Sequence, residues 1–132
     1  MPVPPIVEQA TRRGSIVWVG LDGAVPRPVW HLWHDGACWL VVGGLEQPLP
    51  GAATALTGVV SVRSKERQGG LLVSWVAAVG RVEPGTPAWA DVVPRLHERR
   101  LNAPDGEDQP ARWARESLVL RLSPTGELVA PG

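Results

Sequence analysis

The chain contains no phenylalanine and no tyrosine, so seven tryptophans supply all of its aromatic side chains. Tryptophan must therefore fill the largest core positions, and each buried indole N–H needs a hydrogen-bond acceptor. A single cysteine among the 132 residues excludes an internal disulfide. Lysine is also nearly absent: Lys65 stands alone against twelve arginines.

Net charge is absent as well, because thirteen basic and thirteen acidic residues cancel. Generic binding to nucleic acids or to an anionic membrane surface needs an excess of basic residues, which this chain lacks. No apolar run approaches the roughly 20 residues of a membrane-spanning helix, and the N-terminal residues lack the pattern of a signal peptide. We therefore expect a cytoplasmic protein with no nucleic-acid or membrane partner.

The first residues, 1–13, contain three prolines and little periodicity. They predict an extended N-terminal arm, and residues 14–132 have the length of one domain. Three strands are predicted next, over residues 15–21, 25–34 and 37–42, and an Asp-Gly turn follows each of the first two. These strands should form a meander. The first is apolar on both faces, so we expect both faces to be covered.

The second predicted strand alternates clearly from Val29 onwards. One face should carry Val29, His31 and Trp33. The opposite face should carry Trp30, Leu32 and His34. Prolines 26 and 28 cannot donate to a ladder, which places the start of this strand at a sheet edge or bulge.

Further strands are predicted over residues 59–65, 71–83 and 117–122, the last ending in a turn at 123–126. Thr86 and Pro87 suit the N-cap and first position of a helix. Its packing stripe should be Trp89, Val92, Val93 and Leu96. A short helix is expected over 110–116. The pattern predicts a mainly β fold with six strands, a small closed or partly split barrel with one main helix at its side.

The stretch "VWHLWHDGACWLVVGG" concentrates candidate site residues. His31 and His34 are three apart and should face opposite sides of a strand, so they do not form a metal pair; we expect two partly exposed histidines. Cys38 could pair with His34 across the turn, but no third catalytic group is recognisable, and a core role is the simpler interpretation. Trp30, Trp33 and Trp39 could stack on bases, pack in the core, or line a pocket for a flat heterocycle.

Arg63, Ser64 and Lys65 end an apolar strand just before a turn. Two cations and a hydroxyl in this position could bind a phosphate or carboxylate, or could form a solvated strand end. Glycine pairs at 43–44 and 69–70 would permit close approach of a ligand to the backbone, but they match no phosphate-binding fingerprint.

Two segments carry a family resemblance. "DGAVPRPVWHLWHDGACWLVVGG" resembles the first hairpin of the FMN-binding split barrels, the pyridoxamine 5′-phosphate oxidase-like superfamily, and "VRSKERQGGLLVSWVAAVGRVEPGTPAWADVVPRLHERRL" resembles their later strand pair and helix. The resemblance implies that the mainly β fold is a six-stranded split β-barrel with one main side helix. It also implies a homodimer with a cofactor at the subunit interface. That cofactor is FMN or a deazaflavin, and some members bind haem or biliverdin instead.

The resemblance also implies where the cofactor would lie. The ring would run along Arg27, Val29 and Trp30 and reach Val42 and Gly43 at the end of the third strand. The family's basic helix after that strand is replaced here by "GLEQPLPGAATALTG", which has no basic residue. Either Arg63, Ser64 and Lys65 hold the phosphate instead, or the cofactor is weakly bound or lost.

Two functions remain open at this point. One is an oxidoreductase that uses a flavin or deazaflavin on an unknown small molecule; no residue stands out as its acid or base, so the cofactor would perform the chemistry. The other is a non-catalytic split barrel that binds a ligand or a partner protein.

Overall fold

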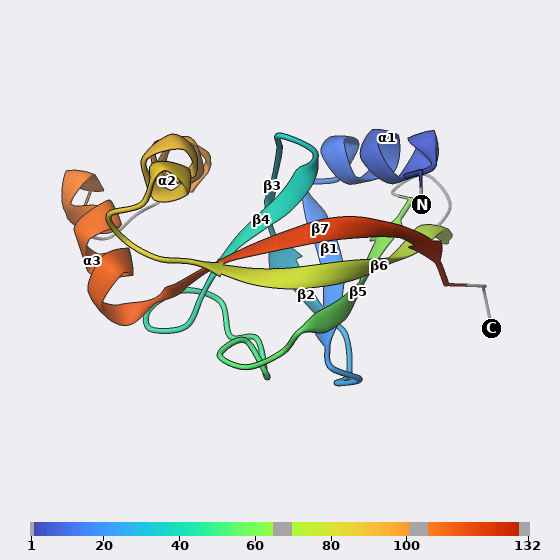
Figure 1. The fold of residues 1–132 in the computed structure, drawn as a ribbon, viewed down its shortest axis with the longest axis horizontal. Coiled ribbons are helices and arrows are strands. Elements are labelled where there is room, and N and C mark those ends of the chain that lie inside the picture. Colours follow the sequence, from blue (N-terminus) through green and yellow to red (C-terminus); the bar gives the residue numbers. More distant parts are fainter. Residues whose placement is uncertain (1, 65–69, 101–105, 130–132) are drawn as a thin grey trace.

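The computed structural model describes residues 2–64, 70–100 and 106–129. Seven strands form one antiparallel sheet: β1 (Ile16–Leu21), β2 (Arg27–Trp30), β3 (Leu32–His34), β4 (Ala37–Val42), β5 (Thr57–Arg63), β6 (Leu71–Val82) and β7 (Leu118–Leu128). The helices are α1 (Pro5–Arg13), α2 (Pro87–Arg99) and α3 (Gln109–Glu116), with a 3-10 turn at Gly106–Asp108. Figure 1 shows α2 and α3 at one end of the sheet and α1 at the other.

The sheet curls because its two edge strands are consecutive in the chain. The strand order is β2-β1-β5-β6-β7-β4-β3, so β2 and β3 lie at opposite ends of the order. Only His31 separates them in sequence. The chain itself therefore draws the two ends of the sheet together, and the mainly β, split-barrel prediction is confirmed.

The predicted number of six strands is wrong, because the run over 25–34 bends at His31 and becomes two strands. Its first half pairs with β1 and its second half with β4, so the predicted meander is present in a bent form. The turn predicted at 123–126 is also wrong. Residues 123 and 124 still pair with β6, and β7 continues to Leu128.

Two hydrophobic clusters lie on the two faces of the sheet. The barrel interior holds Val29 and, at its border, Trp33. Trp30 and Leu32 border the second cluster, which packs under α2 and α3. The alternation predicted for this strand is therefore confirmed on both sides of the bend. The stripe predicted for α2 belongs to the second cluster, and the Thr86 hydroxyl accepts the Trp89 N–H at 3.3 Å as the predicted cap.

The extended arm predicted for residues 1–13 is wrong, since residues 5–13 form α1. Proline occupies the first helical position, where it costs no hydrogen bond, and Arg12 pairs with Glu8 at 2.9 Å one turn away. Val7 and Thr11 are fully buried against the barrel. Packing of a short amphipathic face stabilises this helix, and weak periodicity over nine residues did not reveal it.

The outer face of β1 is more open than expected. Val17, Val19 and Leu21 are buried, whereas 46% of Ile16 is exposed and Trp18 is half-buried. Both Asp-Gly turns are confirmed, with positive φ at Asp22 and Asp35 as well as at the glycines that follow. No helix in the described part of the chain is long and apolar enough to span a membrane; the cytoplasmic location stays a prediction.

Candidate functional site

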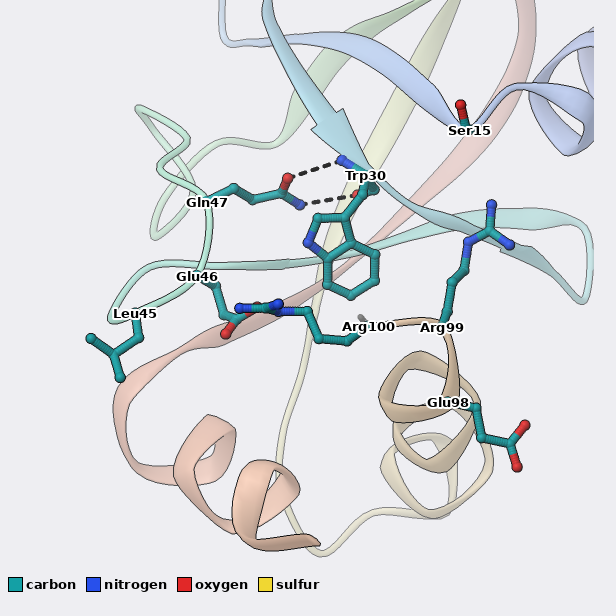
Figure 2. A pocket seen from close by; sticks show the side chains of 8 residues that line it. All are labelled: Ser15, Trp30, Leu45, Glu46, Gln47, Glu98, Arg99 and Arg100. Atoms are coloured by element: carbon teal, nitrogen blue, oxygen red, sulfur yellow. Dashed lines mark hydrogen bonds and ion pairs between the residues drawn. The ribbon is translucent and has the colours of Figure 1, made fainter. Parts of the chain in front are cut away.

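A pocket of about 730 Å³ lies where β2 meets the end of α2. We call it the Trp30 pocket. Its lining comes from four separate segments: Ser15, Trp30, Leu45, Glu46, Gln47, Glu98, Arg99 and Arg100. Figure 2 shows the indole of Trp30 between the loop that carries Gln47 and the arginines at the end of α2. The indole is half-buried, so the pocket has an accessible aromatic wall.

The loop after β4 is held against β2 by the side chain of Gln47. Its amide oxygen accepts the Trp30 backbone N–H at 2.9 Å, and its amide nitrogen donates to the Trp30 carbonyl at 3.0 Å. The same nitrogen lies 3.3 Å from the Val41 carbonyl. Gln47 therefore replaces a strand partner at the bend, where the ladder is interrupted.

A tight glycine turn aims this loop at the pocket. Gly43 and Gly44 both have positive φ, and hydrogen bonds join Gly43 to Glu46 and to Gln47 at 3.0 Å. A Cβ on Gly44 would lie 2.9 Å from the Glu116 carbonyl oxygen. The glycine pair is thus needed for backbone conformation and for close packing on α3.

A buried ion-pair triad lies beside the pocket, and two of its members, Glu46 and Arg100, line it. Both oxygens of Glu46 are engaged: Arg100 donates to one at 2.9 Å and Arg112 to the other at 3.1 Å. The Glu46 side chain is fully buried and that of Arg112 is 6% exposed. The triad ties the loop after β4 to α2 and α3, and it carries one net positive charge.

Arg99 is the exposed cation of the pocket. Its Nε donates to the carbonyl of His31, and its two terminal nitrogens make no hydrogen bond to any described residue. His31 itself is fully buried and donates from Nε2 to the Thr11 carbonyl at 2.7 Å. Burial lowers the pKa of His31, and the nearby charge of Arg99 adds to this effect. A neutral imidazole therefore connects α1, the bend of the sheet and the pocket.

The predicted cofactor residues fall into three groups. Trp30 lines the pocket, and Gly43 forms the turn beside it. Val29 and Val42 are buried in the barrel interior, and Arg27 is exposed on edge strand β2; none of these three lines the pocket.

The residues predicted to hold a phosphate lie elsewhere. Arg63 and Ser64 line a second pocket of about 660 Å³ beside α1. Lys65 lies outside the described residues. Ser15 is common to both pockets. The structure therefore does not bring Trp30 and Arg63 together in one pocket of this chain, and their roles stay predictions.

The histidines and the cysteine have structural environments. His31 is buried rather than partly exposed, which corrects the prediction, whereas half-buried His34 donates to Asp91 at 2.9 Å. That hydrogen bond lowers the pKa of Asp91. Cys38 is buried in the barrel interior, as predicted, and burial raises its pKa well above the usual range. The described residues contain no group of three His, Cys, Asp or Glu side chains that could hold a metal ion.

Trp30 is the only one of the eight lining residues that the sequence analysis predicts, and the other seven include Glu46, Gln47 and Arg99. The stretch "HERR", residues 97–100, is typical of positive charge in the last turn of a helix, and the structure places its Arg99 and Arg100 in the pocket. Nothing in the sequence shows that Gln47 would reach a backbone seventeen residues away.

Comparison with known proteins identifies the fold. No protein-family model and no curated protein sequence matches the chain. The solved structures that resemble it include the heme storage protein HutZ from Vibrio cholerae, at 12% identity and TM-score 0.62 over 98% of this chain and 95% of that one. A candidate pyridoxamine 5′-phosphate oxidase from Listeria innocua has 12% identity and TM-score 0.61, covering 93% and 94% of the two chains.

An F420 reductase also has this architecture, with 16% identity and TM-score 0.59 over 93% of this chain and 96% of that one. The chain therefore has the split-barrel fold of pyridoxamine 5′-phosphate oxidase-like proteins, and the match extends over nearly its whole length. Identities this low establish the fold alone.

The Trp30 pocket fits a flat heterocycle with a short anionic tail. Its volume is within the roughly 300–1,000 Å³ typical of small-molecule sites. Trp30 would contact the ring, and the terminal nitrogens of Arg99 would bind the anion. The charges of the lining residues balance, since Glu46 and Glu98 oppose Arg99 and Arg100.

Proposed function

We propose that this chain is a flavin- or deazaflavin-binding oxidoreductase that acts on a small molecule. The observation that carries the proposal is the Trp30 pocket, in which an accessible indole and an exposed arginine line one cavity. The split-barrel fold supports it, because an F420 reductase has the same architecture. When bound, such a cofactor supplies hydride chemistry, and the protein supplies position and environment.

Each lining residue has a role in this proposal. Trp30 covers one part of the ring and excludes water from it. Arg99 binds the phosphate of FMN, or the anionic tail of a deazaflavin. Gln47 fixes the backbone of Trp30, and the Glu46 triad holds the loop and α2 at the spacing that the ring needs.

The test is a titration of the purified chain with FMN, riboflavin and a deazaflavin, followed by tryptophan emission and by absorption. We expect saturable quenching at micromolar cofactor. Arg99→Gln should weaken FMN about tenfold and leave riboflavin unchanged, because only FMN carries the phosphate; one charged hydrogen bond contributes roughly 1.5–3 kcal/mol. Arg95→Gln is the matched control, since Arg95 is exposed on the same helix but outside the pocket.

If none of the three cofactors quenches the emission, the redox proposal is wrong. The chain would then be a split barrel that binds some other ligand or a partner protein without catalysis. Equal loss of FMN affinity in Arg95→Gln and Arg99→Gln would remove Arg99 from the site.

We also propose a homodimer, the state that the family resemblance implies. Apolar side chains at the ends of two neighbouring strands support it: Leu71 of β6 is 42% exposed, and Leu128 of β7 is 44% exposed. A second copy would cover them. Sedimentation equilibrium should give twice the chain mass, and Leu128→Asp should shift the equilibrium towards the monomer.

A further inference from the structure

A second pocket opens between α1 and the beginning of β1. We call it the α1 pocket. It measures about 660 Å³, and its lining combines apolar side chains, among them Ile6, Ile16, Trp18 and Leu72, with the cationic side chains of Arg13 and Arg63. Several apolar members remain open to solvent, since Ile6 is 40%, Ile16 46% and Leu72 48% exposed. This wall is therefore available to the apolar body of a ligand.

The described lining residues of the α1 pocket carry charge of a single sign. Arg13 and Arg63 are its charged members, and none of the twelve described lining residues is acidic. The Trp30 pocket differs, because its lining contains two glutamates as well as two arginines. A ligand of the α1 pocket should therefore be negatively charged, and a neutral or cationic ligand of the same shape should bind less well.

Arg13 and Arg63 have different surroundings in the α1 pocket. Arg12 pairs with Glu8, whereas Arg13 makes no ion pair with any described residue. The guanidinium carbon of Arg63 lies 5.5 Å from the ring centroid of Trp18. This cation–π contact holds the Arg63 guanidinium against the aromatic part of the lining, and a guanidinium can bind a carboxylate through two of its N–H groups.

We propose that the α1 pocket binds a small amphipathic carboxylate, with one anionic group and an aromatic or aliphatic body. The carboxylate lies at Arg13 and Arg63, and the body lies along Trp18 and the exposed isoleucines. Inorganic anions lack the apolar part, and they leave that wall in water. This binding claim does not depend on the flavin. Ser15 borders both pockets, so a ligand in the α1 pocket would lie next to the Trp30 pocket.

The experiment uses 1-naphthoate as the probe and 1-naphthalenemethanol as its neutral counterpart. Each is titrated into the ¹⁵N-labelled chain without any flavin, and the indole N–H resonance of Trp18 is followed. We expect 1-naphthoate to shift this resonance and to bind at least about tenfold more tightly than the alcohol. Arg13→Gln should weaken 1-naphthoate about fivefold to tenfold, and Arg12→Gln should leave it unchanged.

Arg13 is exposed, so Arg13→Gln should fold, and its amide spectrum verifies this. Equal affinities for the acid and the alcohol would overturn the proposal, as would equal effects of the two arginine substitutions. A Trp18 resonance that responds to protein concentration and not to 1-naphthoate would also overturn it, since the occupant would then be a second copy of this chain. None of these results bears on cofactor binding in the Trp30 pocket.

Discussion

Gln47 forms with Trp30 the pair of hydrogen bonds that a neighbouring β-strand would form. Its amide accepts the Trp30 N–H at 2.9 Å and donates to the Trp30 carbonyl at 3.0 Å, across seventeen residues of sequence. The pair lies at the end of β2, next to the bend at which the barrel closes. One side chain thus stabilises the bend and positions the aromatic wall of the pocket.

Replacing Gln47 should therefore affect both stability and binding. Gln47→Met keeps the length of the side chain but removes both hydrogen bonds, and partly buried backbone groups lose their partners. We expect the free energy of unfolding to fall by about 1–3 kcal/mol in urea denaturation. Gln9→Met, an exposed change on α1, should stay within about 0.5 kcal/mol of the native chain. Equal effects of the two changes would show that the Gln47 amide does not support the bend.

Among the ion pairs of the described residues, the Glu46 triad should be the most sensitive to substitution. Glu46→Gln leaves Arg100 and Arg112 without their shared carboxylate in a buried setting, so we expect destabilisation of about 3 kcal/mol or more. Glu98→Gln, on an exposed residue of the same pocket, should change stability by less than about 0.5 kcal/mol. Thermal or urea unfolding of both variants makes the comparison. A loss below about 1 kcal/mol for Glu46→Gln would equate the triad with a surface ion pair.

Buried His31 should make stability depend on pH on the acid side. Its pKa in the folded chain is lowered by burial, so between that value and the ordinary value of 6.5 the unfolded chain binds more protons. The contribution of His31 is complete above about pH 6.5 and is lost as pH falls through the folded-state pKa. We expect the free energy of unfolding to decrease over this interval. In His31→Gln the decrease should be smaller, and an unchanged pH dependence would exclude His31 as its source.

Alanine substitutions at two glycines distinguish the cost of backbone strain from the cost of steric crowding. Gly44 and Gly36 both have positive φ, but a Cβ at Gly44 would meet Glu116 at 2.9 Å, and one at Gly36 would meet nothing within 4 Å. Gly36→Ala should therefore cost about 1 kcal/mol from conformation alone. Gly44→Ala should cost more, because the loop must also move away from α3. Chemical denaturation of both variants gives the difference, and equal losses would argue against close packing at Gly44.

The sequence predicts most of the barrel because period-two alternation and Asp-Gly turns are local signals. They placed β1, β4 and the faces of the strand through His31 correctly. The bend at His31, in contrast, has no local sequence signal. It follows from the closure of a sheet whose edge strands are consecutive in the chain, and no local pattern reports it. The helix at Pro5–Arg13 was missed for a related reason, since it depends on packing against the barrel.

The site was less predictable than the fold. Trp30 was expected to contact a ligand, and the structure places it in a pocket; the contact itself stays a prediction. The cations of that pocket are Arg99 and Arg100 at the end of α2, about seventy residues after Trp30 in the chain. Arg63 is not among them. A helix end with several arginines is ordinarily explained by the helix dipole, so only three-dimensional placement distinguishes Arg99 from its neighbours.

The most direct test of the account is to locate FMN with the indole N–H resonances of the seven tryptophans. Each indole gives one signal in a ¹⁵N–¹H spectrum, and substitution of single tryptophans assigns them. If the Trp30 pocket holds the flavin, the Trp30 signal shifts most strongly during the titration, and Trp30→Leu weakens FMN about tenfold, as expected for the loss of one stacking contact. A titration in which FMN binds while the Trp30 signal stays in place would contradict the account.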